Sequence, residues 1–399
     1  MRNDRLILTE DSHLSIDLGD VAAPPAPNPT LERLQRRKQD IDARQARIAD
    51  ILAGMACEAA VLFVPAHVAW FCGGFNVRGL LAESERPGLY TNGKQRWLLC
   101  SNLDTQRLFD EELDRLGFQV KEWPWTTGRA VMLGELTAGK RVAADRPFPN
   151  MPLLNEHLRT EIRPFSAYER EEYQHLGHLA AHAVEAVART MNRTDTECEV
   201  AGQLAHRLTR HGVEVAGLSV AGESRSRRYP RPGLTEEPIE GAIRLQATAC
   251  KDGRFVTLSR TLCFGGPSDE VRKEYDLAAK LSAVYRAHAV PDETLTQAAE
   301  AGRRLTHGTP HDYDWRLAQI GYGTGRLPAE ELRRLGQDEK LVYSQALVTQ
   351  AKCGRTAVVD TVLVADHGGQ AVTPPSNWPF KRIKIQERTF DVPDLLVRE

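Results

Sequence analysis

The chain has 399 residues, of which 41% are hydrophobic, and its 52 Lys and Arg residues nearly cancel its 54 Asp and Glu residues. This length favours two domains. The small net charge provides no global basic field for nucleic acid, so we expect no nucleic-acid partner. No apolar run reaches the ~18 residues that a membrane-spanning helix needs, and the N-terminal segment lacks the apolar core of a signal peptide. We therefore expect neither a membrane span nor a membrane partner.

The seven cysteines are odd in number, scattered, and form no C-x-x-C pair. This pattern argues against a zinc-ribbon or thioredoxin-like site. It is typical of reduced cysteines in a cytoplasmic protein.

The first half of the chain reads as a flexible arm followed by an α/β domain. Residues 1–29 end in a Pro/Ala segment and are predicted to be an arm that does not pack. Asn28 and Pro29 suit the N-cap and first turn of a polar helix that runs to about Met55. Strands and a helix then alternate, which favours an α/β domain over 30–163. The expected strands lie at 59–64, 96–100 and 141–144, and the helix at 103–116.

The second half is predicted to be a domain over 164–399. Helices are expected at 167–191, 196–210, 268–290 and 293–306. Thr194 and Glu197 have capping-box spacing, and Gly212 suits a helix C-terminus. Asp252-Gly253 joins two apolar strands, 242–250 and 255–263, and is a strong hairpin signal. Two more strands, 340–352 and 357–364, precede an irregular tail.

Five motifs occur in order through this second half. They are Tyr168-Glu169-Arg170-Glu171-Glu172 before a long helix, Thr194-Asp195-Thr196-Glu197, Ser259-Arg260-Thr261-Leu262-Cys263-Phe264-Gly265 at the end of the hairpin, Ile320-Gly321-Tyr322-Gly323-Thr324-Gly325, and Val359-Asp360-Thr361-Val362-Leu363-Val364. Together they resemble the creatinase / aminopeptidase P / methionine aminopeptidase superfamily over about 163–366. A closer resemblance, at 345–361 and 392–396, is to an Xaa-Pro peptidase-like subgroup that is short of standard metal ligands.

The resemblance implies a creatinase-like α/β N-terminal domain followed by a pita-bread α+β C-terminal domain. It also implies a homodimer, because relatives often form one. In the superfamily, two Asp, one His and two Glu hold two divalent ions, which lower the pKa of a bridging water. The matching positions here are Gln246 (or Ala247, if the turn differs by one residue), Thr257, Tyr322, Gln350 and Val359.

None of these five side chains is the ligand that the superfamily has. The superfamily's substrate-facing His falls on Arg231, which departs from it too. Asp360 cannot replace Val359 as a ligand, because strand neighbours point to opposite faces. We therefore predict no metal site, no Mn, Co or Zn cofactor, and no standard metallopeptidase activity. The predicted pocket would be lined by Arg231, Gln246, Thr257, Arg260, Tyr322, Gln350 and Val359.

Three other clusters have a chemical and a structural interpretation. His175, His178 and His182 share a helix stripe that a metal site could use, but they fall on the polar flank, which favours solvated histidines. His311, Asp312 and Asp314 could do acid–base work, and a polar loop explains them as well. Four arginines around Tyr229 could bind a carboxylate or phosphate, or pair with Glu236, Glu237 and Glu240. They are Arg225, Arg227, Arg228 and Arg231.

Three functions remain open, in this order of preference. The first is a pseudoenzyme that binds a peptide, a protein, an amide or an anionic metabolite. The second is an enzyme that hydrolyses a C–N bond without metal, as creatinase does; against it, the matching pocket positions hold Arg231, Gln350 and Val359. The third is an atypical metallo-aminopeptidase with relocated ligands.

Overall fold

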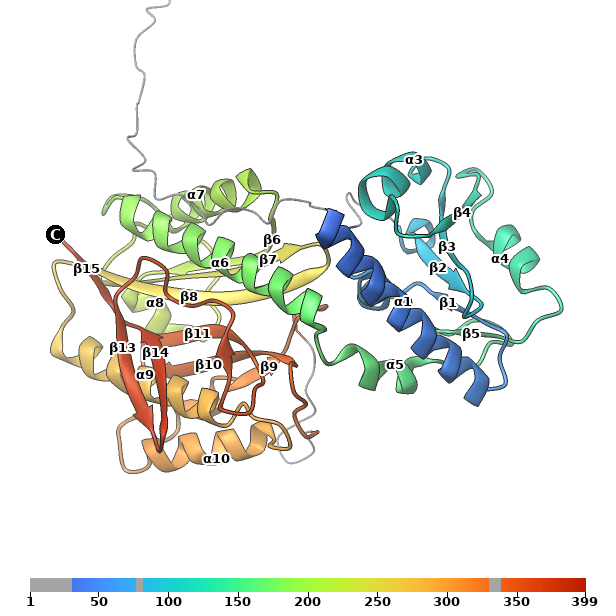
Figure 1. Cartoon of the computed structure of the whole chain (residues 1–399). Helices are drawn as coiled ribbons and strands as arrows, with labels where there is room; N and C mark the ends of the chain where they lie inside the picture. Colours follow the sequence, from blue (N-terminus) through green and yellow to red (C-terminus); the bar gives the residue numbers. More distant parts are fainter. Residues whose placement is uncertain (1–30, 77–81, 330–338) are drawn as a thin grey trace, which may run out of the picture.

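The computed structural model describes residues 31–76, 82–329 and 339–399, and shows two lobes, each built around β-sheet (Figure 1). The predicted arm lies outside the described residues, and so does Asn28, the predicted N-cap of the helix that follows it. Across the described ranges, no helix combines the length and the apolar character needed to cross a membrane.

The first lobe contains a five-stranded sheet with the spatial order β4–β3–β2–β1–β5. Its strands are β1 (Ala59–Leu62), β2 (Gly88–Thr91), β3 (Arg96–Ser101), β4 (Gln119–Trp123) and β5 (Val142–Ala144). Its helical segments are α1 (Leu31–Gly54), α2 (Pro65–Phe71), η1 (Glu83–Glu85), α3 (Thr105–Arg107), η2 (Leu108–Leu113), α4 (Ala130–Thr137) and α5 (Asn155–Ile162). The three predicted strands are confirmed, and the predicted helix at 103–116 is α3 followed by the π-helical η2. Strand β4 was not predicted because it is a largely exposed, polar edge strand.

The second lobe has four long helices and two four-stranded sheets. Its helical segments are α6 (Ala167–Thr190), α7 (Glu197–Arg210), α8 (Glu223–Arg228), α9 (Asp269–Ala287), α10 (Leu295–Thr306) and η3 (Asp314–Arg316). One sheet has the order β15–β8–β7–β6 and the other β12–β11–β10–β9. The strands are β6 (Glu214–Ala221), β7 (Ala242–Lys251), β8 (Arg254–Phe264), β9 (Gly321–Gly323), β10 (Ala346–Cys353), β11 (Thr356–Leu363), β12 (Gln370–Ala371) and β15 (Leu396–Arg398).

The predicted hairpin is confirmed as β7 and β8. Asp252 and Gly253 both have positive φ, 52° and 70°, as a two-residue type I′ turn requires. The turn fixes the register, which places Gln246 opposite Ser259 and Thr248 opposite Thr257.

Two local predictions were wrong. The N-cap of α7 is Thr196 rather than Thr194, and its capping box is completed by Glu199. Asp195 instead belongs to the preceding turn, where its carboxylate accepts from the Asn192 N–H. The tail is not irregular, because β13 (Phe380–Ile385) and β14 (Arg388–Pro393) form an antiparallel ribbon, and the residues of β13 alternate between exposed and half-buried.

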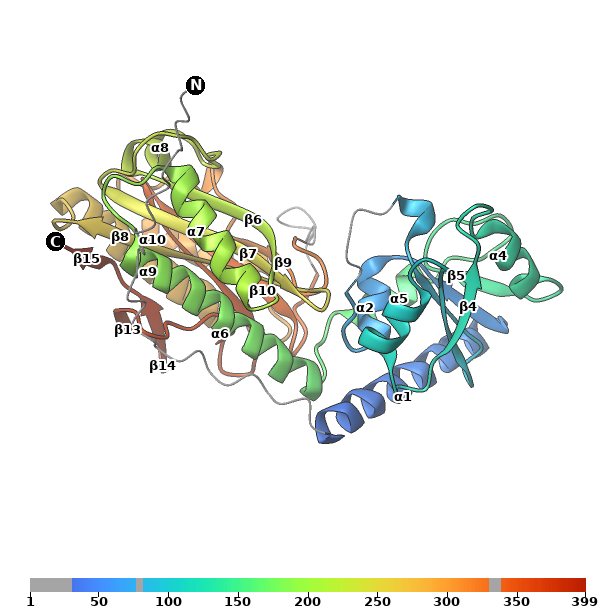
Figure 2. The ribbon, with the colours of Figure 1, turned by 90° about the horizontal axis from the view of Figure 1, so that it is seen from above.

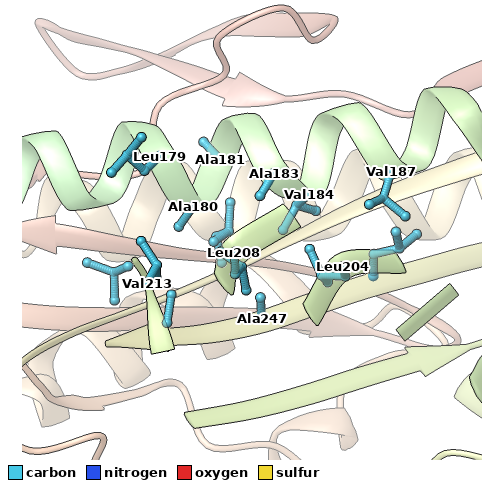
Figure 3. Packing of buried hydrophobic residues seen from close by; sticks show 14 of the residues in the cluster. Leu179, Ala180, Ala181, Ala183, Val184, Val187, Leu204, Leu208, Val213 and Ala247 are labelled. Carbon is cyan, nitrogen blue, oxygen red and sulfur yellow. The ribbon is translucent and has the colours of Figure 1, made fainter. Parts of the chain in front are cut away.

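Helices cover one face of each sheet of the second lobe. Helices α6 and α7 pack against the β7–β8 hairpin, where Val184 of α6 and Leu204 of α7 belong to the same buried cluster as Ala247 (Figures 2 and 3). Helix α9 packs in the same way against β10 and β11. Since side chains alternate along a strand, the residues between these apolar positions point to the opposite face. These two uncovered faces hold the candidate site.

Candidate functional site

Short hydroxyl side chains cover the inner face of the β7–β8 hairpin. Thr248 and Thr257 are opposite each other, and their Oγ1 atoms are hydrogen-bonded at 3.0 Å. Gln246 and Ser259 form the next pair on the same face. The hairpin therefore contributes four uncharged polar side chains, of which Thr257 and Ser259 are buried.

Strand β11 of the second sheet lies beside β8, and side chains join the two. The Thr361 hydroxyl accepts from the Thr257 N–H at 2.8 Å and donates to the Thr257 carbonyl at 2.8 Å. The Ser259 hydroxyl accepts from the Val359 N–H at 3.0 Å. All four of these residues are nearly inaccessible to solvent. We therefore expect this contact between β8 and β11 to be a rigid part of the site.

Tyr322 on β9 completes the hydroxyl cluster. Burial raises the pKa of Tyr322, while a side-chain hydrogen bond with Thr257 and the nearby Arg231 both oppose this shift. Arg231 is further held by a bond from Nη2 to the Gln319 side chain, 3.2 Å. Tyr322 therefore stays neutral at physiological pH and can act as a hydrogen-bond donor or acceptor.

Gln350 and Val359 are direct cross-strand partners on β10 and β11. Val359 is fully buried, whereas Gln350 lines a cavity of about 210 Å³. The other walls of this cavity come from α9, α10 and the segment before β9, including Tyr285, Arg303 and Trp315. Of the predicted pocket residues, Gln350 alone lines this cavity among the described residues, whereas Gln246, Thr257 and Val359 lie on the inner sheet faces.

Arg260 does not line the pocket, contrary to the prediction. It lies on the helix-covered face of β8 and is about 1% exposed. Its guanidinium pairs with Glu185 of α6 and Asp360 of β11, both at 3.1 Å. Asp360 therefore points away from Val359, as the strand geometry predicts, and serves a buried ion-pair network.

The chain was compared with protein families and with solved structures. Residues 171–353 match the model of metallopeptidase family M24. The prolidase from Pyrococcus horikoshii OT3 superposes with a TM-score of 0.69 at 15% identity, over 86% of this chain and 99% of that chain. Over residues 171–353 the chain is similar to metallopeptidase family M24, and its fold is the pita-bread fold of the prolidases and X-Pro peptidases. The predicted fold class, a creatinase-like N-terminal domain before a pita-bread domain, is thereby confirmed.

Two further solved structures, a peptidase and a domain of a protein complex, have a similar fold. The X-Pro aminopeptidase from Thermotoga maritima MSB8 has a TM-score of 0.68 at 14% identity, over 89% of this chain and 99% of that chain. The N-terminal domain of the FACT complex subunit SPT16 from Cicer arietinum has a TM-score of 0.60 at 12% identity, over 87% and 97%. At such identities these likenesses show the fold alone. No curated protein matched the sequence significantly.

The side chains at the five positions predicted to match the superfamily's metal ligands do not fit two divalent ions. Val359 has no donor atom, and Gln246, Thr257, Tyr322 and Gln350 carry no charge. Within 31–76, 82–329 and 339–399, no three His, Cys, Asp or Glu residues gather where they could hold a metal ion.

The histidine stripe of α6 is half-buried rather than fully solvated. The Nε2 atom of His175 is buried and has no hydrogen-bond partner among the described residues. His175 lines a cavity of about 790 Å³ between the lobes, together with Tyr168 and Arg254. His175 therefore belongs to the contact between the lobes, whereas the charged neighbours of His182 lie within the second lobe.

The remaining polar clusters have structural partners. Asp314 accepts from the His311 ring at 2.9 Å and from the Gly354 N–H at 2.6 Å, which ties the loop after α10 to the β10–β11 turn. Arg225 pairs with Glu197 at 2.9 Å, and not with the three glutamates considered above. Sequence reasoning missed Thr248, Ser259 and Thr361; the two-residue period of the strands carries the signal that would have found them.

Proposed function

We propose that this protein is a pita-bread protein without the two-metal site, which binds a small peptide, amide or anionic metabolite between its inner sheet faces. The observation that supports the proposal is the hydroxyl cluster itself. Where the resemblance places an aspartate and a histidine of the superfamily's metal site, this chain has Thr257 and Tyr322, and Thr257 is hydrogen-bonded to Thr248. Such groups donate and accept hydrogen bonds, as recognition of an amide requires, but they do not neutralise two M²⁺ ions.

Metal content tests this proposal directly. Tag-free protein dialysed against Mn²⁺, Co²⁺ and Zn²⁺ should retain fewer than about 0.1 ions per chain by inductively coupled plasma mass spectrometry, since a built site survives dialysis. Xaa-Pro dipeptides and creatine should remain uncleaved with and without these metals.

A variant with the superfamily's ligands restored is the matched control. It carries Gln246→Asp, Thr257→Asp, Tyr322→His, Gln350→Glu and Val359→Glu. If the restored variant retains metal and the natural chain does not, the five positions account for the loss. Stoichiometric metal in the natural chain, or cleavage of an Xaa-Pro dipeptide, would overturn the proposal.

A further inference from the structure

A buried arginine on the inner face of β7 has no acidic partner. Arg244 is 4% exposed, and its Nε atom is buried without a hydrogen-bond partner. No ion pair joins it to a carboxylate in the described part of the chain. Burial alone lowers the pKa of its guanidinium to about 10, so it remains charged at neutral pH. A buried charge without a partner is costly, which makes this an exceptional position.

A second buried arginine on the same hairpin, Arg260, differs because its guanidinium has acidic partners. Arg260 is equally buried, yet it pairs with Glu185 and Asp360 and donates to the Thr373 carbonyl at 2.9 Å. The two arginines lie on opposite faces of β7–β8, because Arg244 is in register with Thr261 rather than with Arg260. Among the described residues, the face that carries Arg260 supplies paired carboxylates, and no carboxylate pairs with Arg244.

A second orphaned polar atom lies next to Arg244. The Oγ1 atom of Thr261, its cross-strand partner, is also buried without a hydrogen-bond partner among the described residues. Gln246 and Thr248 continue the same face along β7 toward the hydroxyl cluster. The unsatisfied groups therefore extend the candidate site rather than form an isolated defect.

Lys352 on β10 adds a second cation. It is two residues beyond Gln350, points to the same face and lines the same cavity. Its ammonium group donates to the carbonyls of Ser226, 3.4 Å, and Gly354, 2.7 Å. Burial lowers the pKa of Lys352, and the nearby Arg244 lowers it further.

The acids closest to Lys352 are already engaged. Asp314 accepts from His311 and the Gly354 N–H. Glu274 accepts from the Arg355 side chain at 3.0 Å. Neither acid bonds to Lys352 or Arg244, so neither cation is directly paired with a carboxylate among the described residues.

We propose that Arg244 and Lys352 bind an oxyanion, a carboxylate or phosphate group at one end of the ligand, with Thr261 as an additional hydrogen-bond donor. This inference rests on the proposed function, since it describes the ligand of the same inner face. The guanidinium fork suits either oxyanion, and Lys352 retains one proton beyond its two carbonyl bonds.

Titration with inorganic phosphate and with succinate tests this inference, using calorimetry and thermal unfolding of the whole chain. The natural protein should be stabilised by at least one probe, and the stronger probe identifies the oxyanion. Arg244→Met should weaken that binding by at least about tenfold. The same change should raise the melting temperature in probe-free buffer by a few degrees, because it removes an unpaired buried charge.

Three further variants make the result decisive. Arg260→Met should lower the melting temperature and Lys384→Met, on the exposed ribbon, should leave probe binding unchanged. Lys352→Gln tests the second cation if Arg244→Met fails to fold, and should also weaken binding by about tenfold. Absence of binding to the natural chain, or unchanged binding in both Arg244→Met and Lys352→Gln, would overturn the inference. Metal retention would overturn the proposed function separately, since it is measured without either probe.

Discussion

Thr257 is the most connected hydroxyl of the candidate site. Its backbone amide and carbonyl both bond to the Thr361 hydroxyl, and its own hydroxyl reaches Thr248 and Tyr322. An aspartate at this point would be a metal ligand by comparison with the superfamily. The threonine hydroxyl is instead hydrogen-bonded to the hydroxyls of Thr248 and Tyr322. Hydrogen bonds therefore connect the strands here in place of a metal ion.

Replacing Arg260 by Met should be strongly destabilising. The change leaves Glu185 and Asp360 as buried carboxylates without their cation, and breaking such a pair costs about 3–5 kcal/mol. Urea unfolding followed by circular dichroism measures the loss. The paired change Glu185→Gln with Asp360→Asn in the Arg260→Met background should restore part of the stability; no restoration would show that packing, not charge, dominates.

Stability should fall on acidification through His175 and His182. Burial lowers the pKa of both imidazoles from the ordinary value of 6.5, and neighbouring basic side chains, Lys251 for His175 and His211 and Arg207 for His182, lower it further. The unfolded chain therefore takes up these protons first as the pH falls through 6.5. The stability contribution is present above this value and is lost as the pH approaches the lower pKa of the folded state.

Urea midpoints at pH 7.5 and pH 5 measure this effect. The His175→Gln, His182→Gln double variant should lose less stability over this interval than the natural chain. His157→Gln, on the exposed side of α5, is the control and should behave like the natural chain. An unchanged pH dependence in the double variant would contradict the assignment.

At the scale of elements, Gly177 lets helix α6 approach the segment that follows β12. A Cβ atom at this position would lie 1.9 Å from the Val372 carbonyl oxygen. Gly177→Ala gains about 1 kcal/mol of helix propensity, but the clash with backbone outweighs it, so we expect a net loss of at least about 2 kcal/mol. Gly202→Ala on α7 has open space and should instead be stabilising by up to about 1 kcal/mol. Chemical unfolding measures the free energy of unfolding of both variants. A gain in both would show that helix propensity outweighs packing at Gly177.

Local sequence signals predicted the elements that depend on local energies. The Asp252-Gly253 turn and the long helix α6 were found because turn chemistry and helical periodicity act within a few residues. Strand β4 is polar and β15 has three residues, so their pairing depends on distant partners that a local pattern cannot indicate. The same reason explains Arg244. Its isolation follows from which residues lie near it in space, whereas the prediction of missing ligands at Gln246 and Val359 rests on local motifs.

At the scale of the whole molecule, Glu169 at the start of α6 links the two lobes. It is 1% exposed and pairs with Arg44 of α1 at 2.7 Å and with Arg326 at 2.6 Å. Glu169→Gln leaves two buried cations without this partner and should cost about 3 kcal/mol or more. Glu171→Gln, which breaks the exposed pair with Arg36 between the same two helices, should cost less than about 1 kcal/mol. Equal losses in calorimetric unfolding would rule out burial as the deciding factor.

The pairing of β15 with β8 has a consequence for biosynthesis. Leu396–Arg398 run parallel to Leu262–Phe264, and the Arg398 guanidinium donates to the Ala188 carbonyl, 210 residues earlier. At about 5–20 residues per second, translation leaves this edge of the hairpin open for on the order of ten seconds after the hairpin itself has been made. An unpaired edge is a template for aggregation during that interval. Nascent chains stalled before residue 396 should therefore depend on chaperones more than the released protein does.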